Sequence, residues 1–306
     1  MAKRILVVGS TNIDFVLNTP YIPAPGETMI SMDKYAFTPG GKGANTAVAA
    51  KAFGADVSFC TRVGDDAYGD RMISLFAEKG IDTRYMKVDR LEQTGLGVVM
   101  VEKNGTNRIV VFSGANKKIN DSDVEAAMSC CPDAVISQFE IQPEAVIAAA
   151  RGAAYEGAKF ILDAGAAKPD FPLSKLEQVE IFSPNEVETE ILTGIRPSNL
   201  ENCLRASIAL CNKVDIKYVV LKLGARGCYV YDGKYCDLIS PCEVPVVDTT
   251  AAGDVFTAAL TAEYLRTEDI LASAKFANAA GALAVSKKGA IASIPNLDEV
   301  KNMMLQ

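Results

Sequence analysis

The sequence of 306 residues contains no histidine. A Ser-His-Asp or Cys-His nucleophilic system therefore cannot be built from this chain, and neither can an H-E-x-x-H zinc site. Any general base has to be Asp, Glu, Lys, Tyr or Cys. The eight cysteines include no C-x-x-C pair, which excludes zinc-ribbon and thioredoxin-like patterns. Several cysteines lie in apolar stretches, so we expect buried thiols in a reducing compartment.

Long apolar runs and a basic charge balance are also missing. No stretch approaches the ~18 apolar residues of a membrane span, and the apolar run at 5–8 is too short for a signal-peptide core. The net charge is −7 and the pI is about 4.9, whereas nucleic-acid-binding domains are usually basic. We expect a cytoplasmic protein with no nucleic-acid or membrane partner. The basic pairs at 117–118 and 287–288 are either local anion contacts or solvated surface.

Short apolar runs alternate with helical patterns along most of the chain. The runs lie at 5–8, 57–60, 134–136, 160–162, 181–182 and 218–221. Helices are expected at about 42–53, 69–79, 122–130, 143–155, 185–193 and 199–213, with successive helices over 252–305. This alternation predicts an α/β fold in which helices cover both faces of a mostly parallel sheet. No linker or repeat divides residues 1–306, so a single domain is expected.

Two regions interrupt the alternation. The segments 15–17 and 28–37 resemble strands with no helix between them, and the β-rich runs 97–101 and 107–112 flank an Asn-Gly pair. Asn-Gly between such runs is a strong hairpin signal, because the turn needs positive φ at both central residues. We expect a small antiparallel sheet, inserted at about 14–38 and 95–112, that acts as a lid or a dimer contact. A plain surface hairpin is the alternative.

The segment 248–254 has the sequence D-T-T-A-A-G-D and leads directly into an apolar helix. The first amides of such a helix lack intrahelical partners, and together with the helix dipole they favour an anion such as a phosphoryl group. Gly253 would let the backbone approach that group closely. Asp254 would then lie where a base takes a proton from an attacking hydroxyl. The alternative is that Asp254 is only an N-cap.

The segment 39–45 has the sequence P-G-G-K-G-A-N. It lacks the P-loop spacing, and the chain contains no G-x-G-x-x-G, so a dinucleotide-binding site is not supported. Three close glycines around Lys42 still expose amides and one cation at a helix start. A tight strand-to-helix turn is the alternative.

Three further acidic positions stand out. Asn185 and Glu188 lie three residues apart at a helix start, where they could position a hydrated Mg²⁺; a dipole-favoured acidic helix start is the alternative. Asp14 follows the first strand, and Glu140 follows the strand at 134–137. Ligands of open α/β sheets bind outside the carboxyl ends of strands, so these two carboxylates are candidates for sugar hydroxyls.

Together these residues resemble the ribokinase-like, PfkB-type carbohydrate kinases. The two signatures are G-G-K-G-A-N at 40–45 and D-T-T-A-A-G-D at 248–254, and the similarity extends over essentially the whole chain. The resemblance implies a ribokinase-like three-layer sandwich with a central mostly parallel sheet and a small β-sheet lid, which often pairs in a homodimer. It also implies ATP, Mg²⁺ and a monovalent cation, usually K⁺. The expected reaction phosphorylates D-ribose at O5 to give ribose 5-phosphate and ADP.

The resemblance also implies roles by motif position. Asp254 is expected as the base, with Ala251, Ala252 and Gly253 as the anion hole. The sugar is expected at Asn12, Asp14, Gly41, Lys42, Asn45 and Glu140. The nucleotide is expected at Asn185, Lys222, Gly224, Gly227, Gly253 and Asn278, with Glu188 tied indirectly to Mg²⁺. The monovalent cation is expected at Asp248, Thr250, Ala284, Lys287, Gly289 and Ser293.

The chain departs from the family pattern in two places. Residues 163–167, D-A-G-A-A, replace a more common Asn-Pro-Ala type segment, and Asn278 stands where many members have histidine. One alternative is a kinase of the same family for deoxyribose, a ketose, a sugar acid or a nucleoside; Lys42 with Glu140 favours ribose. The other is a catalytically silent sugar-binding protein, since a fold alone does not prove activity. The retained base and anion hole argue against the silent protein.

Overall fold

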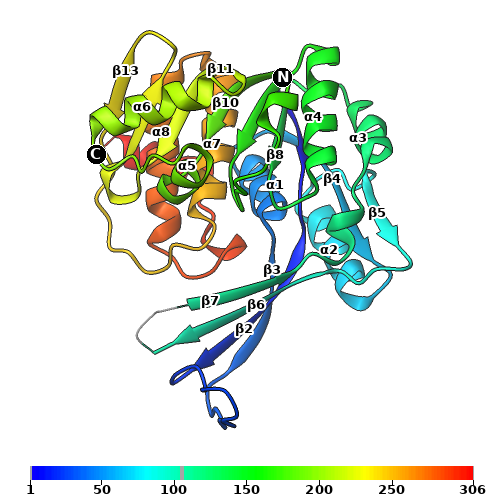
Figure 1. Ribbon diagram of the computed structural model, residues 1–306. Coiled ribbons are helices and arrows are strands. Elements are labelled where there is room, and N and C mark those ends of the chain that lie inside the picture. The colour runs from blue at the N-terminus through cyan, green and yellow to red at the C-terminus, as the bar shows by residue number, and fades with distance from the viewer. Residues whose placement is uncertain (1, 104–106, 306) are drawn as a thin grey trace.

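The computed structural model describes residues 2–103 and 107–305 (Figure 1). Two sheets hold the strands of these residues. The strands are β1 (Arg4–Val8), β2 (Asn12–Thr19), β3 (Tyr35–Gly40), β4 (Asp56–Gly64), β5 (Met86–Asp89), β6 (Gly95–Glu102), β7 (Asn107–Phe112), β8 (Ala134–Gln138), β9 (Lys159–Asp163), β10 (Gln178–Ser183), β11 (Asp215–Lys222), β12 (Cys228–Tyr231) and β13 (Cys236–Ile239).

The larger sheet has the strand order β13-β12-β11-β10-β9-β8-β1-β4-β5 within the described residues. The strands from β11 to β5 pair in parallel, and β12 and β13 add an antiparallel edge. The expected mostly parallel sheet is therefore confirmed, and each of the six apolar runs lies in one of its strands. The sequence analysis missed β5, β12 and β13, which are only four residues long. Runs of that length carry little periodic signal.

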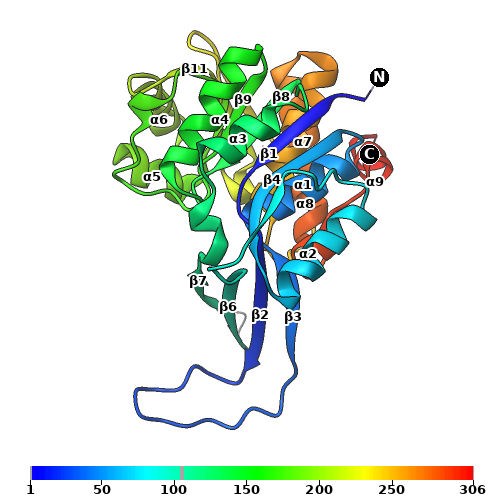
Figure 2. The same cartoon turned by 90° about the vertical axis from the view of Figure 1, so that its right-hand side faces the viewer.

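The helices form a layer on each face of the larger sheet (Figure 2). They are α1 (Lys42–Ala52), α2 (Ala67–Glu78), α3 (Asp121–Met128), α4 (Pro143–Glu156), α5 (Glu186–Thr193), α6 (Leu200–Cys211), α7 (Ala252–Thr267), α8 (Ile270–Val285) and α9 (Leu297–Met304). The helices α3 to α6 cover one face, while α1, α2 and α7 to α9 cover the other. The predicted helices are confirmed with small differences at their ends.

Strand β1 shows how the two faces divide the core. Its side chains alternate, so Ile5 and Val7 join the core under α1 and α7, whereas Leu6 and Val8 join the core under α3 and α4. All four side chains are buried. This two-sided burial explains why the strand is a continuous apolar run instead of an alternating one. It also places the carboxyl end of β1 in the centre of the molecule.

The smaller sheet projects from the body in the order β3-β2-β6-β7 (Figure 1). The expected antiparallel pairing is right for β2–β3 and β6–β7, but the central pair β2–β6 is parallel. The strand expected at 28–37 was placed too early, because β3 begins at Tyr35. The pairing of β3 with β2 begins at Tyr35, opposite Leu17, so residues 28–34 lie outside the strand; Ile30 and Met32 are 84% and 93% exposed. The Asn104-Gly105 turn lies outside the described residues.

All eight cysteines are free. Cys60, Cys203 and Cys228 are buried as expected, but Cys131 and Cys236 are exposed, which corrects the expectation of uniformly buried thiols. The described part of the chain contains no helix that combines the length and apolarity required to traverse a bilayer.

Candidate active site

Asp254 lies in the first turn of α7, with its side chain directed inward. The N-cap of α7 is Ala251, which adopts a left-handed conformation with φ of 62°, and the i→i−4 ladder begins with the Val255 N–H donating to Ala251 O at 2.9 Å. The interpretation of Asp254 as an N-cap is therefore wrong. The Ala252 amide donates to Thr249 O at 3.3 Å. The Gly253 and Asp254 amides precede the ladder, in the position where an anion can be bound.

The Asp254 carboxylate is 4% exposed and lies between two groups of α1. Asn45 Nδ2 donates to Asp254 Oδ2 at 2.8 Å, and Lys42 Nζ lies 3.9 Å from Asp254 Oδ1. Burial raises the pKa of Asp254 to about 6, Lys42 opposes that rise, and the charge of Asp163 adds to it. A carboxyl group with this pKa is ionised at neutral pH yet accepts a proton readily, which suits a general base.

Asp14 lies on β2, between two glycines of the neighbouring strands. A Cβ atom at Gly40 of β3 or at Gly97 of β6 would collide with the Asp14 carboxylate. Burial, followed by the charges of Glu140 and Asp254, raises the pKa of Asp14 to about 7. The carboxylates of Asp14, Glu140 and Asp254 therefore lie near one another at the base of the projecting sheet.

Glu140 and the start of α1 hold each other in place. Glu140 Oε2 accepts hydrogen bonds from Ser10 Oγ and from the Lys42 amide, the latter at 3.0 Å. Gly41 precedes Lys42 with φ of 93°, and a Cβ there would approach the Asn12 amide nitrogen to 2.9 Å. The turn at 39–45 is thus tight, as the alternative interpretation required, and it also brings Lys42 to Asp254. Asp254 is the first cause of the raised pKa of Lys42.

Asn116 holds Asn12 in place, a contact that the sequence analysis missed. Asn116 lies in a short 3-10 helix (Gly114–Lys118) after β7. Its Oδ1 accepts from the Thr11 amide at 2.9 Å, while its Nδ2 donates to Thr11 O at 3.1 Å and to Asn12 Oδ1 at 2.8 Å. The Asn12 side chain is therefore held by a residue that follows β7, the strand at one edge of the projecting sheet.

Asn185 and Glu188 form a capping box at the start of α5. The Glu188 amide donates to Asn185 Oδ1 at 2.9 Å, and the Asn185 amide donates to Glu188 Oε2 at 2.8 Å. The helix-start interpretation therefore describes their local structure. Burial raises the pKa of Glu188 and the charge of Asp163 adds to that rise, whereas Lys222 and Lys42 oppose it, so further positive charge would favour the ionised carboxylate. A hydrated Mg²⁺ would supply that charge, so these residues fit the ion.

The other predicted nucleotide residues have structural roles of their own. Asn278 on α8 donates from Nδ2 to Ile239 O at 3.2 Å and to Ser240 O at 3.0 Å, which ties α8 to the end of β13. Gly224 and Gly227 have φ of 56° and 85° and form the turn between β11 and β12. Lys222, at the end of β11, points toward the first turn of α7: its Nζ lies 2.6 Å from Asp163 Oδ2 and 3.5 Å from the position of a Cβ at Gly253.

The residues predicted for a monovalent cation lie in the loop before α7, in the last turn of α8 and in the segment that follows α8. Asp248 Oδ1 accepts from the Thr250 amide at 3.0 Å, and Asp248 Oδ2 accepts from the Gly289 amide at 2.8 Å. The Lys287 amide donates to Ala284 O at 3.2 Å, and Ser293 Oγ donates to Ala290 O at 2.8 Å. The described residues contain no group of three or more His, Cys, Asp or Glu that could hold a metal ion. One carboxylate with backbone carbonyls nonetheless fits a hard cation such as K⁺.

The basic pairs have acidic partners. Lys117 Nζ and Lys118 Nζ lie 2.9 Å and 3.7 Å from Glu92, and Lys287 Nζ lies 2.6 Å from Glu299. For Lys117, Lys118 and Lys287, these contacts support the interpretation as solvated surface.

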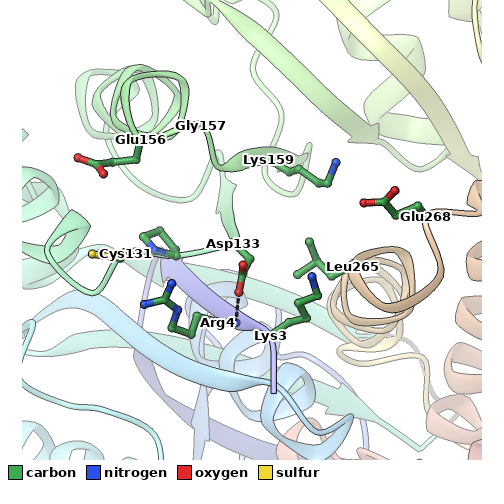
Figure 3. A pocket seen from close by; sticks show the side chains of 10 residues that line it. Lys3, Arg4, Cys131, Asp133, Glu156, Gly157, Lys159, Leu265 and Glu268 are labelled. Carbon is green, nitrogen blue, oxygen red and sulfur yellow. Dashed lines mark hydrogen bonds between the residues drawn. The ribbon is translucent and has the colours of Figure 1, made fainter. Parts of the chain in front are cut away.

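A hollow of about 360 Å³ lies at the opposite, amino end of the larger sheet (Figure 3). Its lining includes Lys3, Arg4, Asp133, Lys159 and Glu268. None of the predicted site residues lines it. The predicted sugar residues gather instead where β1 and β8 end and the projecting sheet begins.

A model of the pfkB family of carbohydrate kinases matches residues 2–297. The chain belongs to this family. Ribokinase of Haemophilus influenzae is 36% identical over 98% of this chain and 97% of that protein. Deoxyribokinase of Salmonella typhi is 30% identical over 96% of each chain. The solved structure of Arabidopsis thaliana ribokinase complexed with ribose and ATP superimposes with a TM-score of 0.90, at 32% identity and 99% coverage of both chains. The ribokinase-like fold is thereby confirmed.

Proposed function

We propose that this chain transfers the γ-phosphoryl group of ATP to O5 of D-ribose, which yields ribose 5-phosphate and ADP. The observation that carries the proposal is the buried Asp254 carboxylate, held by Asn45 and Lys42 at the first turn of α7. The similarity to ribokinases, one of them solved with ribose and ATP, supports ribose as the acceptor.

In the proposed reaction the chain positions the reactants and compensates charge. Asp14, Lys42 and Glu140 bind the sugar hydroxyls, together with Asn12, Gly41 and Asn45. The O5 hydroxyl attacks the γ-phosphorus, its proton passes to Asp254, and the bond to the ADP oxygen breaks. The amides at 251–253 receive the phosphoryl group, and Asn185, Lys222, Gly224, Gly227 and Asn278 bind the nucleotide. Such positioning and charge stabilisation supply most of the catalysis in phosphoryl transfer.

Two ions complete the proposed site. Glu188 with Asn185 would hold Mg²⁺ through water, and the ion would offset phosphate charge. Asp248, Thr250, Ala284, Lys287, Gly289 and Ser293 would hold K⁺, several of them through backbone carbonyls. The positive charge of K⁺ would then lie next to the start of α7, where the phosphoryl group is proposed to bind.

An acceptor panel tests the proposal. ADP release is measured with ribose, deoxyribose, a ketose, a sugar acid and a nucleoside, each with Mg²⁺ and with K⁺ or choline. We expect the highest kcat/KM with ribose and faster turnover with K⁺. A much higher kcat/KM with deoxyribose would favour the alternative that the 30%-identical deoxyribokinase suggests. If ADP is released with none of these acceptors, the chain is a silent sugar-binding protein.

We also propose a cytoplasmic homodimer that associates through the projecting sheet. The free cysteines fit a reducing compartment. Strand β7 is the last strand of that sheet, and its Val110, Val111 and Phe112 are 48%, 43% and 57% exposed. An edge strand with apolar side chains favours pairing with a second chain. Light scattering should give twice the mass of the chain, and a monomer at micromolar concentration would contradict the dimer.

A further inference from the structure

Three side chains from separate elements meet beneath the first turn of α7. Asp163 ends β9, Lys222 ends β11 and Thr257 lies on α7, one turn after Gly253. Strand β10 separates β9 from β11, so the two strands lie about 10 Å apart and the charged side chains reach toward each other across the end of β10. Asp163 Oδ2 accepts from Lys222 Nζ at 2.6 Å and also from Thr257 Oγ1.

The ammonium group of Lys222 touches the proposed anion site. A methyl group added at Gly253 would lie 3.5 Å from Lys222 Nζ and 3.9 Å from Lys222 Cε. The side chain of Lys222 is 11% exposed and that of Asp163 is 3% exposed, so the pair is largely withdrawn from water. Lys42, the other cation of the site, lies against Asp254 on the sugar side. Lys222 is therefore the ammonium group that lies beside the backbone of Gly253.

The hydrogen bonds of Lys222 leave it able to bind an anion. An ammonium group has three donors. Asp163 accepts from one of these donors, and Thr257 Oγ1 lies 3.4 Å from Nζ and accepts from a second. Among the described residues no further acceptor engages Nζ, so the third donor can bind a ligand. The site holds two ammonium groups, those of Lys42 and Lys222. Its carboxylates are more numerous: Asp14, Glu140, Asp163, Glu188 and Asp254. A phosphoryl group entering such a site requires a cation close to it.

We propose that Lys222 contacts the phosphoryl group during transfer, and that Asp163 and Thr257 are positioning residues that hold its ammonium group against Gly253. This inference rests on the proposed function, because it deepens the role of one nucleotide residue. Lys222 keeps its proton throughout: the acceptor proton goes to Asp254, the new O–P bond forms, and the electron pair of the old bond leaves with ADP. Its contribution is to stabilise negative charge on the phosphoryl oxygens.

Kinetics of two variants separate this role from an ordinary buried ion pair. Lys222→Met alone leaves Asp163 buried without its partner, which can destabilise the fold. The double variant Asp163→Asn/Lys222→Met removes both charges and is expected to fold, as melting and circular dichroism would check. We expect both variants to lose about 10²–10³-fold in kcat. If the double variant regains wild-type kcat, the pair is only structural and the inference is overturned.

Lys217→Met is the matched control on the same strand. Lys217 also pairs with a carboxylate, Glu180, at 2.8 Å, but it lies near the start of β11, away from α7's first turn. We expect wild-type kcat for this variant. An equal loss of kcat in Lys217→Met and Lys222→Met would show that any lost lysine of β11 slows the enzyme, and it would overturn the inference.

Nucleotide binding tests the contact without any sugar. Calorimetry compares ADP alone with ADP plus aluminium fluoride, which mimics a transferring phosphoryl group. We expect the double variant to bind ADP alone within about threefold of wild type, but to lose at least about tenfold toward ADP with aluminium fluoride. Equal losses for both ligands would overturn the role of Lys222. The proposed function is tested separately by the acceptor panel, so a different acceptor with the same aluminium fluoride result would affect only the choice of sugar.

The pH profile reports the positions of the charges. Asp14, Lys42, Asp163 and Lys222 are the charged groups around Asp254, and of these Asp163 raises its pKa while Lys222 lowers it. Asp163→Asn should therefore move the acid limb of kcat/KM to lower pH, and Lys222→Met should move it to higher pH. Unmoved limbs in both variants would contradict the arrangement.

Discussion

The two ends of the larger sheet both gather charged side chains, but only one end buries them. At the carboxyl end, Asp254 is buried and Asp14 is half-buried, and burial raises the pKa values of both. At the amino end, Lys3, Arg4 and Glu268 are exposed around the hollow of Figure 3. The Arg4 amide there donates to an Asp133 oxygen at 2.7 Å. Charge becomes chemically useful where the fold holds it out of water with incomplete compensation.

The largest effect should come from Asp254. We expect Asp254→Asn to lose about 10²–10⁴-fold in kcat while ribose binding is retained, because the amide cannot accept the hydroxyl proton. Steady-state kinetics and ribose calorimetry measure the two quantities. Glu268→Gln removes an acidic side chain at the amino end of the sheet. It is the control and should keep wild-type kcat. Near-wild-type turnover in Asp254→Asn would remove Asp254 from the mechanism.

A smaller effect should follow from filling the space beside Asp14. A Cβ atom at Gly97 would collide with Asp14 Oδ1, so Gly97→Ala should displace the carboxylate and lower kcat/KM for ribose by about 10–10²-fold. Gly281→Ala is the matched control, since its added Cβ would meet Ala252 O at an ordinary 3.8 Å. Should Gly97→Ala match the control in kcat/KM, Asp14 does not bind the sugar.

Lowering the pH should reduce activity but increase the contribution of Asp14 and Asp254 to the free energy of unfolding. Asp14 takes up a proton near pH 7 and Asp254 near pH 6. Protonation of Asp254 alone should lower kcat/KM by about tenfold between pH 7.5 and 5, and protonation of Asp14 should deepen the fall. Their folded pKa values exceed the unfolded ones, so the stability they contribute is complete below the unfolded pKa and is lost as pH rises through about 6 to 7. Asp254→Asn should therefore gain more thermal stability over wild type at pH 8 than at pH 5. An equal difference at both pH values would contradict the raised pKa.

The smallest effect is expected at the amino end. Glu268 follows α7 with φ of 57°, in the left-handed region. Glu268→Gly should relieve that strain and raise the free energy of unfolding by about 0.5–1 kcal/mol. Turnover should not change, because the residue lies at the far end of α7 from Asp254. Denaturant unfolding and kcat measure both; a changed kcat would mean that the two ends of the sheet communicate.

The parts of the site that were predictable from the sequence are those with a local pattern. Lys42, Asn45 and Asp254 belong to two glycine-rich helix starts, and the structure brings the three together. Asp163 carries the same signal that marked Asp14 and Glu140, an acidic residue directly after a buried strand, and it could have been found.

Other features depend on contacts that no local pattern encodes. Asn116 hydrogen-bonds to Thr11 across 105 positions of sequence, so nothing near Asn116 announces its partner. The start of β3 at Tyr35 depends on its pairing with Leu17 of β2, a contact between residues 18 positions apart. The inward direction of Lys222 likewise depends on the buried Asp163 of another strand.

Strand β2 belongs to the projecting sheet, yet it carries Asp14, whereas Asp254 belongs to the body. The proposed sugar site therefore lies between the projecting sheet and the body, and not within either of them. A sugar that contacts both carboxylates would link the two parts. A tilt of the sheet relative to the body would change the distance between Asp14 and Asp254.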